Sequence, residues 1–355
     1  MATTVIVKVG TNTLVDEAGG VRKGVVRDIL TSIQDAAGRG ISIVLVTSGA
    51  VRLGSISTGD VNLNRSTAAS IGEPILFRHY ASEAEKLHIL LAEFLLTRSS
   101  LVQRQEFSGL QKTFEDLFAR GIIPVVNEND ALVADIGGSF GDNDSLASAL
   151  AIALHAEELV IVSHIDGLFD RDPAKEHGAK LIGIVNDVNN ELFKFSSRGV
   201  STGGRGGMLS KLKAARLCTA VGIKTCIVNG LVSGNLARIL SGEAVGTTFT
   251  PRPFTKALTA RDRWLLAAKN SAGSLLIDDG AVSALRNSKS LLAVGVRGVY
   301  GEFQAKEIIE VVDGMRRGIA FGIVDYSREE IEAMLREGTT SGKQLIHANN
   351  MIVLE

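Results

Sequence analysis

The stretch of residues 5–13, VIVKVGTNT, places a short apolar run containing one lysine directly before a glycine turn. Short runs rich in valine and isoleucine that end in a turn are typical of buried parallel strands. The same pattern recurs at residues 41–46, 121–126, 159–162 and 224–228. We therefore expect five parallel strands whose following turns meet at the carboxyl edge of one sheet, where ligands bind in such folds.

Helical patterns separate these runs, at residues 24–38, 82–97, 110–120, 145–155 and 208–221. Alternation of strands and helices predicts an α/β fold, with a mostly parallel sheet covered by helices on both faces as an αβα sandwich. The pattern changes after about residue 245, where Pro251 and Pro253 precede the only tryptophan, Trp264. Short β-like pieces follow at residues 274–277, 291–296, 307–312 and 319–324. We expect a large domain over residues 1–250, a linker over 251–262 and a small β-rich domain over 263–355.

Composition and charge exclude several classes of protein. The 355 residues are 45% hydrophobic and 22% charged, which is globular rather than disordered. The 38 basic and 39 acidic residues balance, so any polyanion must be held by a local site. Residues 257–355 carry 12 basic and 13 acidic side chains, a balance that argues against a nucleic-acid partner.

Two further features of the sequence predict the cellular location of the protein. No apolar run reaches the roughly 18 residues of a membrane span, and the N-terminus lacks the features of a secretion signal. We expect a soluble, cytoplasmic protein without a membrane partner. Cys218 and Cys226 are expected as buried, reduced thiols that form no disulfide.

Two glycine loops follow the first two runs. Lys8 precedes Gly10, whose turn can turn backbone amides toward a phosphate. Ser48 and Gly49 end the second run and open a helix, where an anion is also favoured. Each loop has an ordinary structural interpretation that remains open: a lysine extending into solvent at a strand end, and a serine that only caps a helix.

The third polar region combines residues 127–130, NEND, with residues 141–145, GDNDS. Carboxylates and amides can hold a substrate ammonium group, orient lysines or bind Mg²⁺ through water. Turns stabilised by Asn and Asp side chains are the alternative interpretation of each piece.

The fourth region, residues 203–211 with the sequence GGRGGMLSK, is a glycine loop leading into a helix and suits the phosphate chain of a nucleotide. It is neither a P-loop nor a dinucleotide fingerprint, and a flexible linker remains the alternative. The six histidines show no metal-ligand spacing. The available chemistry is electrostatic, as phosphoryl transfer requires.

In this order, these segments resemble the amino acid kinase family, most closely its members that phosphorylate glutamate. The resemblance covers nearly the whole chain, and the tail from Leu258 resembles a PUA domain. The segments that carry it are residues 8–11, 48–50, 127–130, 141–144, 167–169, 172–173 and 206–211.

The resemblance implies transfer of the γ-phosphoryl group of ATP, with Mg²⁺, to the side-chain carboxylate of L-glutamate. The product would be L-glutamyl 5-phosphate, in the first step of proline biosynthesis. Feedback inhibition by proline and a homo-oligomer, a dimer or a tetramer, are expected on the same basis.

The resemblance also implies residue roles. Lys8 and Lys211 would bracket the transferred phosphoryl group, and Asp144 would orient both lysines. Glutamate would be held by Ser48, Gly49, Asp130 and Asn143. ATP would contact Lys8, Gly10, Ser163, His164, Arg205, Gly206, Gly207, Met208, Leu209, Ser210 and Lys211.

Two departures from the family pattern fall on the nucleotide side. Ser163 and His164 stand where a Thr-Asp pair is usual, and Arg205 stands where threonine is common. Arg205 would add a phosphate contact, and His164 would alter nucleotide binding or its pH dependence.

Several alternatives remain at this level. Related enzymes use aspartate, N-acetylglutamate, carbamate or uridylate with the same sheet and glycine loops. An RNA-binding or RNA-modifying factor is an alternative from another class, because PUA modules commonly serve there. A non-catalytic metabolite sensor is a third, against which Lys8, Asp144 and Lys211 weigh.

Overall fold

The computed structural model describes residues 3–60, 62–132, 139–173, 176, 178–188, 192, 207–251, 258–267 and 273–354. The chain divides into two compact units, Met1–Phe254 and Thr255–Glu355, each with its own hydrophobic core. None of the helices in these ranges combines the length and apolar character needed to span a lipid bilayer.

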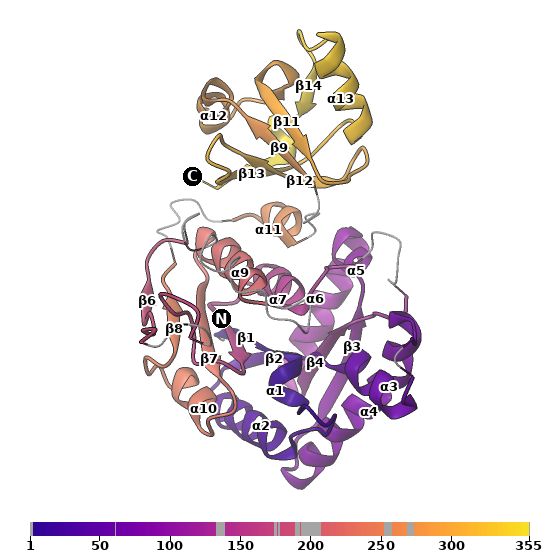
Figure 1. Cartoon of the computed structure of the whole chain (residues 1–355), viewed down its shortest axis with the longest axis vertical. Helices are drawn as coiled ribbons and strands as arrows, with labels where there is room; N and C mark the ends of the chain where they lie inside the picture. The colour runs from indigo at the N-terminus through magenta and orange to yellow at the C-terminus, as the bar shows by residue number, and fades with distance from the viewer. Residues whose placement is uncertain are drawn as a thin grey trace. The chain divides into compact units, whose positions relative to one another are not determined.

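The first unit is built on a large, mostly parallel sheet (Figure 1). Its order in the described residues is β3-β4-β2-β1-β5-β7-β8-β6, and only the β7–β8 pair is antiparallel. The expected α/β class is therefore confirmed, together with all five predicted strands. The strands are β1 (Thr4–Val9), β2 (Ser42–Val46), β3 (Leu91–Leu96), β4 (Ile123–Glu128), β5 (Glu158–Ser163), β6 (Ile184–Val185), β7 (Lys224–Asn229) and β8 (Thr247–Phe249).

Helices cover both faces of this sheet (Figure 1). On one face α2, α4 and α10 share a core with the strands, and on the other α7 packs against α9 and β1. The helices are α1 (Thr11–Leu14), α2 (Lys23–Gly38), α3 (Ala50–Thr58), α4 (Arg65–Lys86), α5 (Arg98–Val102), α6 (Arg104–Ala119), α7 (Asn143–Ala153), α9 (Met208–Ala220) and α10 (Asn235–Leu240).

The alternation of side chains along β1 places one lysine among apolar residues. Val5, Val7 and Val9 point into the core with α2 and α4. Because successive residues of a strand face opposite sides, Lys8 faces α7 instead. The sequence of the strand thus directs this lysine to the α7 face at the carboxyl edge.

Helices α3 and α4 approach each other unusually closely. A Cβ atom on Gly72 would lie 1.7 Å from the carbonyl oxygen of Ala50, and one on Gly54 would lie 1.8 Å from that of Ala68. Only glycine fits at either crossing point, since no side-chain atom can occupy that space. The close approach fixes the position of α4 relative to the start of α3, which follows the Ser48–Gly49 loop.

The helix predicted at residues 82–97 is confirmed as far as Lys86 and is wrong beyond it. Helix α4 ends at Lys86, and Leu91–Leu96 form β3, which among the described residues is an edge strand paired with β4 alone. Its Leu, Ala and Glu residues favour helix locally, but pairing with β4 overrides that preference. The cysteines follow the prediction: Cys218 on α9 and Cys226 on β7 are buried as thiols and are not joined in a disulfide.

The second unit contains a five-stranded sheet of order β11-β9-β12-β13-β15, a short β10–β14 pair and three helices in the described residues. This β-rich character is as predicted. Its elements are α11 (Ala260–Ala267), β9 (Ser274–Ile277), α12 (Asp279–Arg286), β10 (Leu291–Leu292), β11 (Val296–Tyr300), β12 (Ile308–Val312), β13 (Gly318–Ile323), α13 (Arg328–Glu337), β14 (Gln344–Ile346) and β15 (Met351–Val353), with short 3₁₀ turns at Ala293–Gly295 and Ala348–Asn350. Residues 252–257 of the expected linker lie outside the described residues, and α11 begins within its expected range.

Candidate active site

A cleft of about 790 Å³ lies at the carboxyl edge of the large sheet. It is formed by the turns after β1, β2, β4 and β5, together with the starts of α3 and α7. This is the edge at which parallel α/β sheets bind their ligands. Nine of the residues to which the resemblance assigns a role line it: Lys8, Gly10, Ser48, Gly49, Asp130, Asn143, Ser163, His164 and Lys211.

Two lysines meet one carboxylate beside this cleft. Lys8 Nζ lies 2.8 Å from Asp144 Oδ1, and Lys211 Nζ lies 3.2 Å from Asp144 Oδ2. The three residues are buried, with exposed fractions of 3%, 0% and 5% for Lys8, Asp144 and Lys211. Ser210 donates a further hydrogen bond of 2.5 Å to Asp144 Oδ2. Strand β1 and helices α7 and α9 thus each contribute a member of one charged cluster.

The charges of this cluster depend on one another. Burial disfavours the charge of Asp144, yet Lys211 and Lys8 outweigh that effect and hold its pKa below the ordinary value. Burial lowers the pKa of Lys211, and Asp144 offsets part of that change. Asp144 is therefore ionised, and the two lysines give the cluster an excess of positive charge at the cleft.

The first two glycine loops differ from their simplest interpretations. Ser48 does not cap α3: its hydroxyl donates to the carbonyl of Val9 at 2.8 Å, and Gly49 is the capping residue. Gly49 has φ +116°, a conformation that favours glycine. The N–H of Gly10 donates to the carbonyl of Val162 at 3.1 Å. Gly10 therefore offers the cleft a surface without a side chain rather than a free amide.

Two acceptors face the cleft on the side of β4. Asp130 Oδ1 is held by Arg65, at 3.1 Å from Nε and 3.0 Å from Nη2. Asn143 Nδ2 donates to the carbonyl of Thr47 and to Asn127 Oδ1, both at 2.8 Å. Asn143 Oδ1 is buried without a hydrogen-bond partner among the described residues. An unpaired buried acceptor is costly, which favours a ligand N–H donor at this position.

Only some of the residues expected to bind ATP lie at the cleft. Ser163 and His164 line the cleft, whereas Met208, Leu209 and Ser210, in the first turn of α9, do not. Gly207 caps α9. Arg205 and Gly206 lie outside the described residues. Burial lowers the pKa of His164, with Lys211 and Arg22 adding to the effect, so its imidazole is neutral at pH 7.

Comparison with known families agrees with this geometry. Residues 3–229 match the model of the amino acid kinase family, and residues 273–341 match that of the PUA domain. The chain belongs to the amino acid kinase family.

Curated relatives match this amino acid kinase over almost its whole length. A glutamate 5-kinase of Thermoanaerobacter sp. is 34% identical, covering 99% of this chain and 98% of the relative. A glutamate 5-kinase of Caldanaerobacter subterraneus is 35% identical with the same coverage. One from Nostoc punctiforme is 33% identical, and both chains are covered completely.

Solved structures share the fold of the first unit. UMP kinase from Bacillus anthracis aligns with a TM-score of 0.50 and 17% identity, over 70% of this chain and 96% of that enzyme. N-acetylglutamate synthase from Neisseria gonorrhoeae aligns with a TM-score of 0.51 and 16% identity, over 71% of this chain and 62% of that protein. At this identity the likeness concerns the fold alone.

Sequence reasoning did not single out several residues of the cleft. Arg22, Arg52 and Arg65 add positive charge to its lining. Arg52 lies in the first turn of α3, directly after the Ser48–Gly49 loop. Its position beside a predicted anion-binding loop could have identified it as a residue of the cleft. No local pattern distinguishes Arg65, because its contact with Asp130 joins segments 65 residues apart.

Proposed function

We propose that this amino acid kinase transfers the γ-phosphoryl group of ATP to the side-chain carboxylate of L-glutamate, forming L-glutamyl 5-phosphate and ADP. This is the first step of proline biosynthesis. Relatives named glutamate 5-kinase that match 99% of the chain support the proposal. The observation that carries it is the buried cluster of Lys8, Asp144 and Lys211 beside the cleft.

The chemistry needs charge neutralisation rather than a base. A glutamate side chain, with an ordinary pKa of about 4.3, is already ionised at pH 7 and attacks as the carboxylate. The barrier is the repulsion between this anion and the phosphates. Lys8 and Lys211 stabilise the charge on the transferred group, and Asp144 holds both ammonium groups in place without reorganisation during the reaction.

The acceptor is held from the opposite side of the cleft. Asp130 and Asn143 Oδ1 are hydrogen-bond acceptors, as the ammonium group of an amino acid requires. Ser48 and Gly49 form the adjoining wall, where the absence of a side chain at Gly49 lets the substrate approach the backbone. N-acetylation would remove the positive charge that Asp130 attracts, so this wall favours a free amino acid.

The nucleotide binds over Ser163, His164 and the start of α9. The described residues contain no group of three or more acidic, histidine or cysteine side chains that could hold a metal ion. Mg²⁺ would be carried on the phosphates of ATP and would supply additional positive charge there. The protein contributes the lysines, and Arg205 is proposed as a further phosphate contact.

An acceptor panel tests this function. The purified protein is incubated with ATP, Mg²⁺ and L-glutamate, and the acyl phosphate is trapped as its hydroxamate. Aspartate, N-acetylglutamate, carbamate and uridylate are tested beside it, with ADP release as the common measurement. We expect acyl phosphate from glutamate alone. Preference for another acceptor would overturn the roles of Asp130 and Asn143, and inactivity of folded protein with all acceptors would overturn the function.

Four further properties are proposed, the first two from the family resemblance and the last two from the sequence itself. They are feedback inhibition by proline, assembly as a homo-oligomer (a dimer or a tetramer), a cytoplasmic location and the absence of a nucleic-acid partner. The balanced charge of residues 257–355 supports the last of these. Inhibition of the hydroxamate assay by proline and the mass of the protein in solution test the first two.

A further inference from the structure

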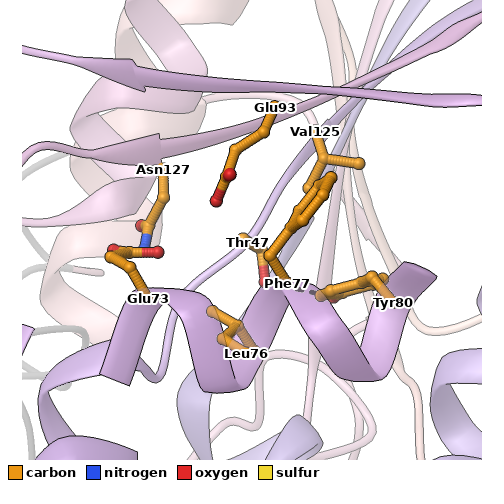
Figure 2. A pocket seen from close by; sticks show the side chains of 8 residues that line it. All are labelled: Thr47, Glu73, Leu76, Phe77, Tyr80, Glu93, Val125 and Asn127. Carbon is orange, nitrogen blue, oxygen red and sulfur yellow. Dashed lines mark hydrogen bonds between the residues drawn. The ribbon is translucent and has the colours of Figure 1, made fainter. Parts of the chain in front are cut away.

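A buried carboxyl group lies on the opposite face of the sheet from the lysine cluster. Glu73 on α4 is 7% exposed, and its side chain points toward Asn127 at the end of β4 (Figure 2). Glu93 extends from β3 toward the same small cavity. The cavity measures only about 10 Å³, which is at the lower limit for a single water molecule. It is too small to be a ligand site of its own.

Hydrogen bonds connect Glu73 to the cleft through two amides. Asn127 Nδ2 donates to Glu73 Oε1 at 2.5 Å, and Asn127 Oδ1 accepts from Asn143 Nδ2 at 2.8 Å. The backbone N–H of Glu128 donates a second bond, of 3.0 Å, to Asn127 Oδ1. The chain therefore runs from α4 through β4 to the first residue of α7.

The donors and acceptors of this chain determine which way each amide faces. An amide nitrogen carries two protons, and Asn143 Nδ2 donates them to Thr47 and Asn127. An amide oxygen has two lone pairs, and Asn127 Oδ1 accepts two bonds. Rotating the amide of Asn143 by half a turn would set acceptor against acceptor, and rotating that of Asn127 would set donor against donor. Asn143 must then present its oxygen, which has no partner among the described residues, to a ligand.

We propose that Glu73 is a positioning residue for the acceptor: it orients the amide of Asn127, which orients that of Asn143, so that Asn143 Oδ1 receives the ammonium group of glutamate. This inference rests on the proposed function and deepens it. Glu73 does not touch the substrate, because its side chain lines the small cavity and not the cleft.

Charge supports this role for a neutral acid. Burial raises the pKa of Glu73 to about 8, although the bond from Asn127 opposes the shift. The charged groups that act on it, Glu93 from β3 and Asp130 after β4, raise the pKa further. Arg65 is already engaged by Asp130. At pH 7 the carboxyl group is mostly protonated, so it accepts from Asn127 without placing a negative charge beneath the site.

The test compares glutamate with glutarate, which has the same two carboxylates but no ammonium group. We expect Glu73→Leu to raise the KM for glutamate at least about tenfold and to leave the KM for ATP unchanged. The reason is that the charge-assisted hydrogen bond from the ammonium group of glutamate to Asn143 Oδ1 would be misaligned. The inhibition constant of glutarate should change by less than about twofold. Glu73→Gln retains a carbonyl acceptor on the same stem and should restore the KM for glutamate to within about threefold of the parent.

Glu93→Gln is the matched control, since Glu93 lines the same cavity and takes no part in the hydrogen-bond chain. This variant should leave the KM for glutamate and the inhibition constant of glutarate near those of the parent. If Glu73→Leu does not fold, Glu73→Met replaces it and retains the length of the side chain. Equal changes for glutamate and glutarate, or a loss confined to kcat, would overturn the proposal. Failure of the parent protein to phosphorylate glutamate would instead reject the proposed function.

Discussion

Two sets of buried polar side chains lie at the carboxyl edge of one sheet, on opposite faces, and burial has opposite outcomes in them. On the face of α7 and α9, Asp144 contacts two lysines and remains ionised. On the face of α4, Glu73 contacts an amide, with Glu93 and Asp130 as its charged neighbours, and its pKa rises to about 8. A low-dielectric interior therefore retains a charge where a counter-charge is in contact and neutralises it elsewhere.

The difference between the two sets also separates two tasks. Phosphoryl transfer needs positive charge close to the reacting atoms, and the lysine cluster supplies it. Orientation of the acceptor needs fixed hydrogen-bond directions. The uncharged hydrogen-bond chain of Glu73, Asn127 and Asn143 provides them without an electric field that would disturb the substrate. The following experiments test this division, from the largest expected effect to the smallest.

Removal of either lysine should have the largest effect on turnover. Lys8→Ala and Lys211→Ala should each lower kcat at least about 10²-fold, a loss of a few kcal/mol of electrostatic stabilisation. The hydroxamate assay measures the change. Lys86→Ala, which removes an exposed lysine that pairs with Glu83 at the end of α4, is the control. Near-normal turnover of either variant would contradict the role of the cluster.

Displacement of α4 should disturb the hydrogen-bond chain from Glu73 through Asn127 to Asn143. It should leave the cluster of Lys8, Asp144 and Lys211 in place. In Gly72→Ala the new Cβ would lie 1.7 Å from the carbonyl oxygen of Ala50, so α3 and α4 must separate. We expect a loss of about 1–3 kcal/mol in the free energy of unfolding in urea, and a higher KM for glutamate with a smaller change in kcat. Gly109→Ala in α6 meets no atom within 4 Å and should be neutral or stabilising. Equal stabilities of the two variants would refute the close crossing.

Protonation of Glu73 should make stability depend on pH. Its pKa rises from 4.5 in the unfolded chain to about 8 in the folded protein. Between these values the folded state retains a proton that the unfolded state has lost, so raising the pH favours unfolding by up to about 1.4 kcal/mol per unit. The stability of the parent relative to Glu73→Gln should therefore fall as the pH rises through this window.

Urea unfolding of both proteins across that pH range measures the difference. Asp144 does not interfere, because its lowered pKa gives stability that is present above its ordinary value and is lost only as the pH falls below it. Parallel curves for the parent and Glu73→Gln would show that Glu73 is ionised in the folded state.

The smallest expected effect concerns His164. Its lowered pKa predicts a constant KM for ATP between about pH 7 and pH 8. At pH values below the ordinary pKa of 6.5, the imidazole takes up a proton that adds positive charge near the phosphates, and the KM should fall by no more than about threefold. His164→Asn should abolish this change, and His88→Asn, at an exposed position whose φ of 54° asparagine tolerates, should retain it. A pH effect that persists in His164→Asn would assign it to another group.

Much of the fold could be predicted because its signals are local. The apolar runs define the five central strands, and alternation along residues 5–9 directs Lys8 to one face of the sheet. The error at residues 82–97 has a physical reason: Leu, Ala and Glu favour helix in isolation, and only pairing with β4 makes Leu91–Leu96 a strand.

The sequence by itself determined the class of fold, the loops at the carboxyl edge and the charged residues that those loops carry. Tertiary structure alone decided which side chains meet. The contact between Glu73 and Asn127 joins residues 54 apart, and that between Lys211 and Asp144 joins residues 67 apart. Such contacts depend on how helices pack across the sheet, as the Gly72 crossing shows for α4. Hydrogen-bond direction and burial then set the protonation of each group, and neither is encoded in local spacing.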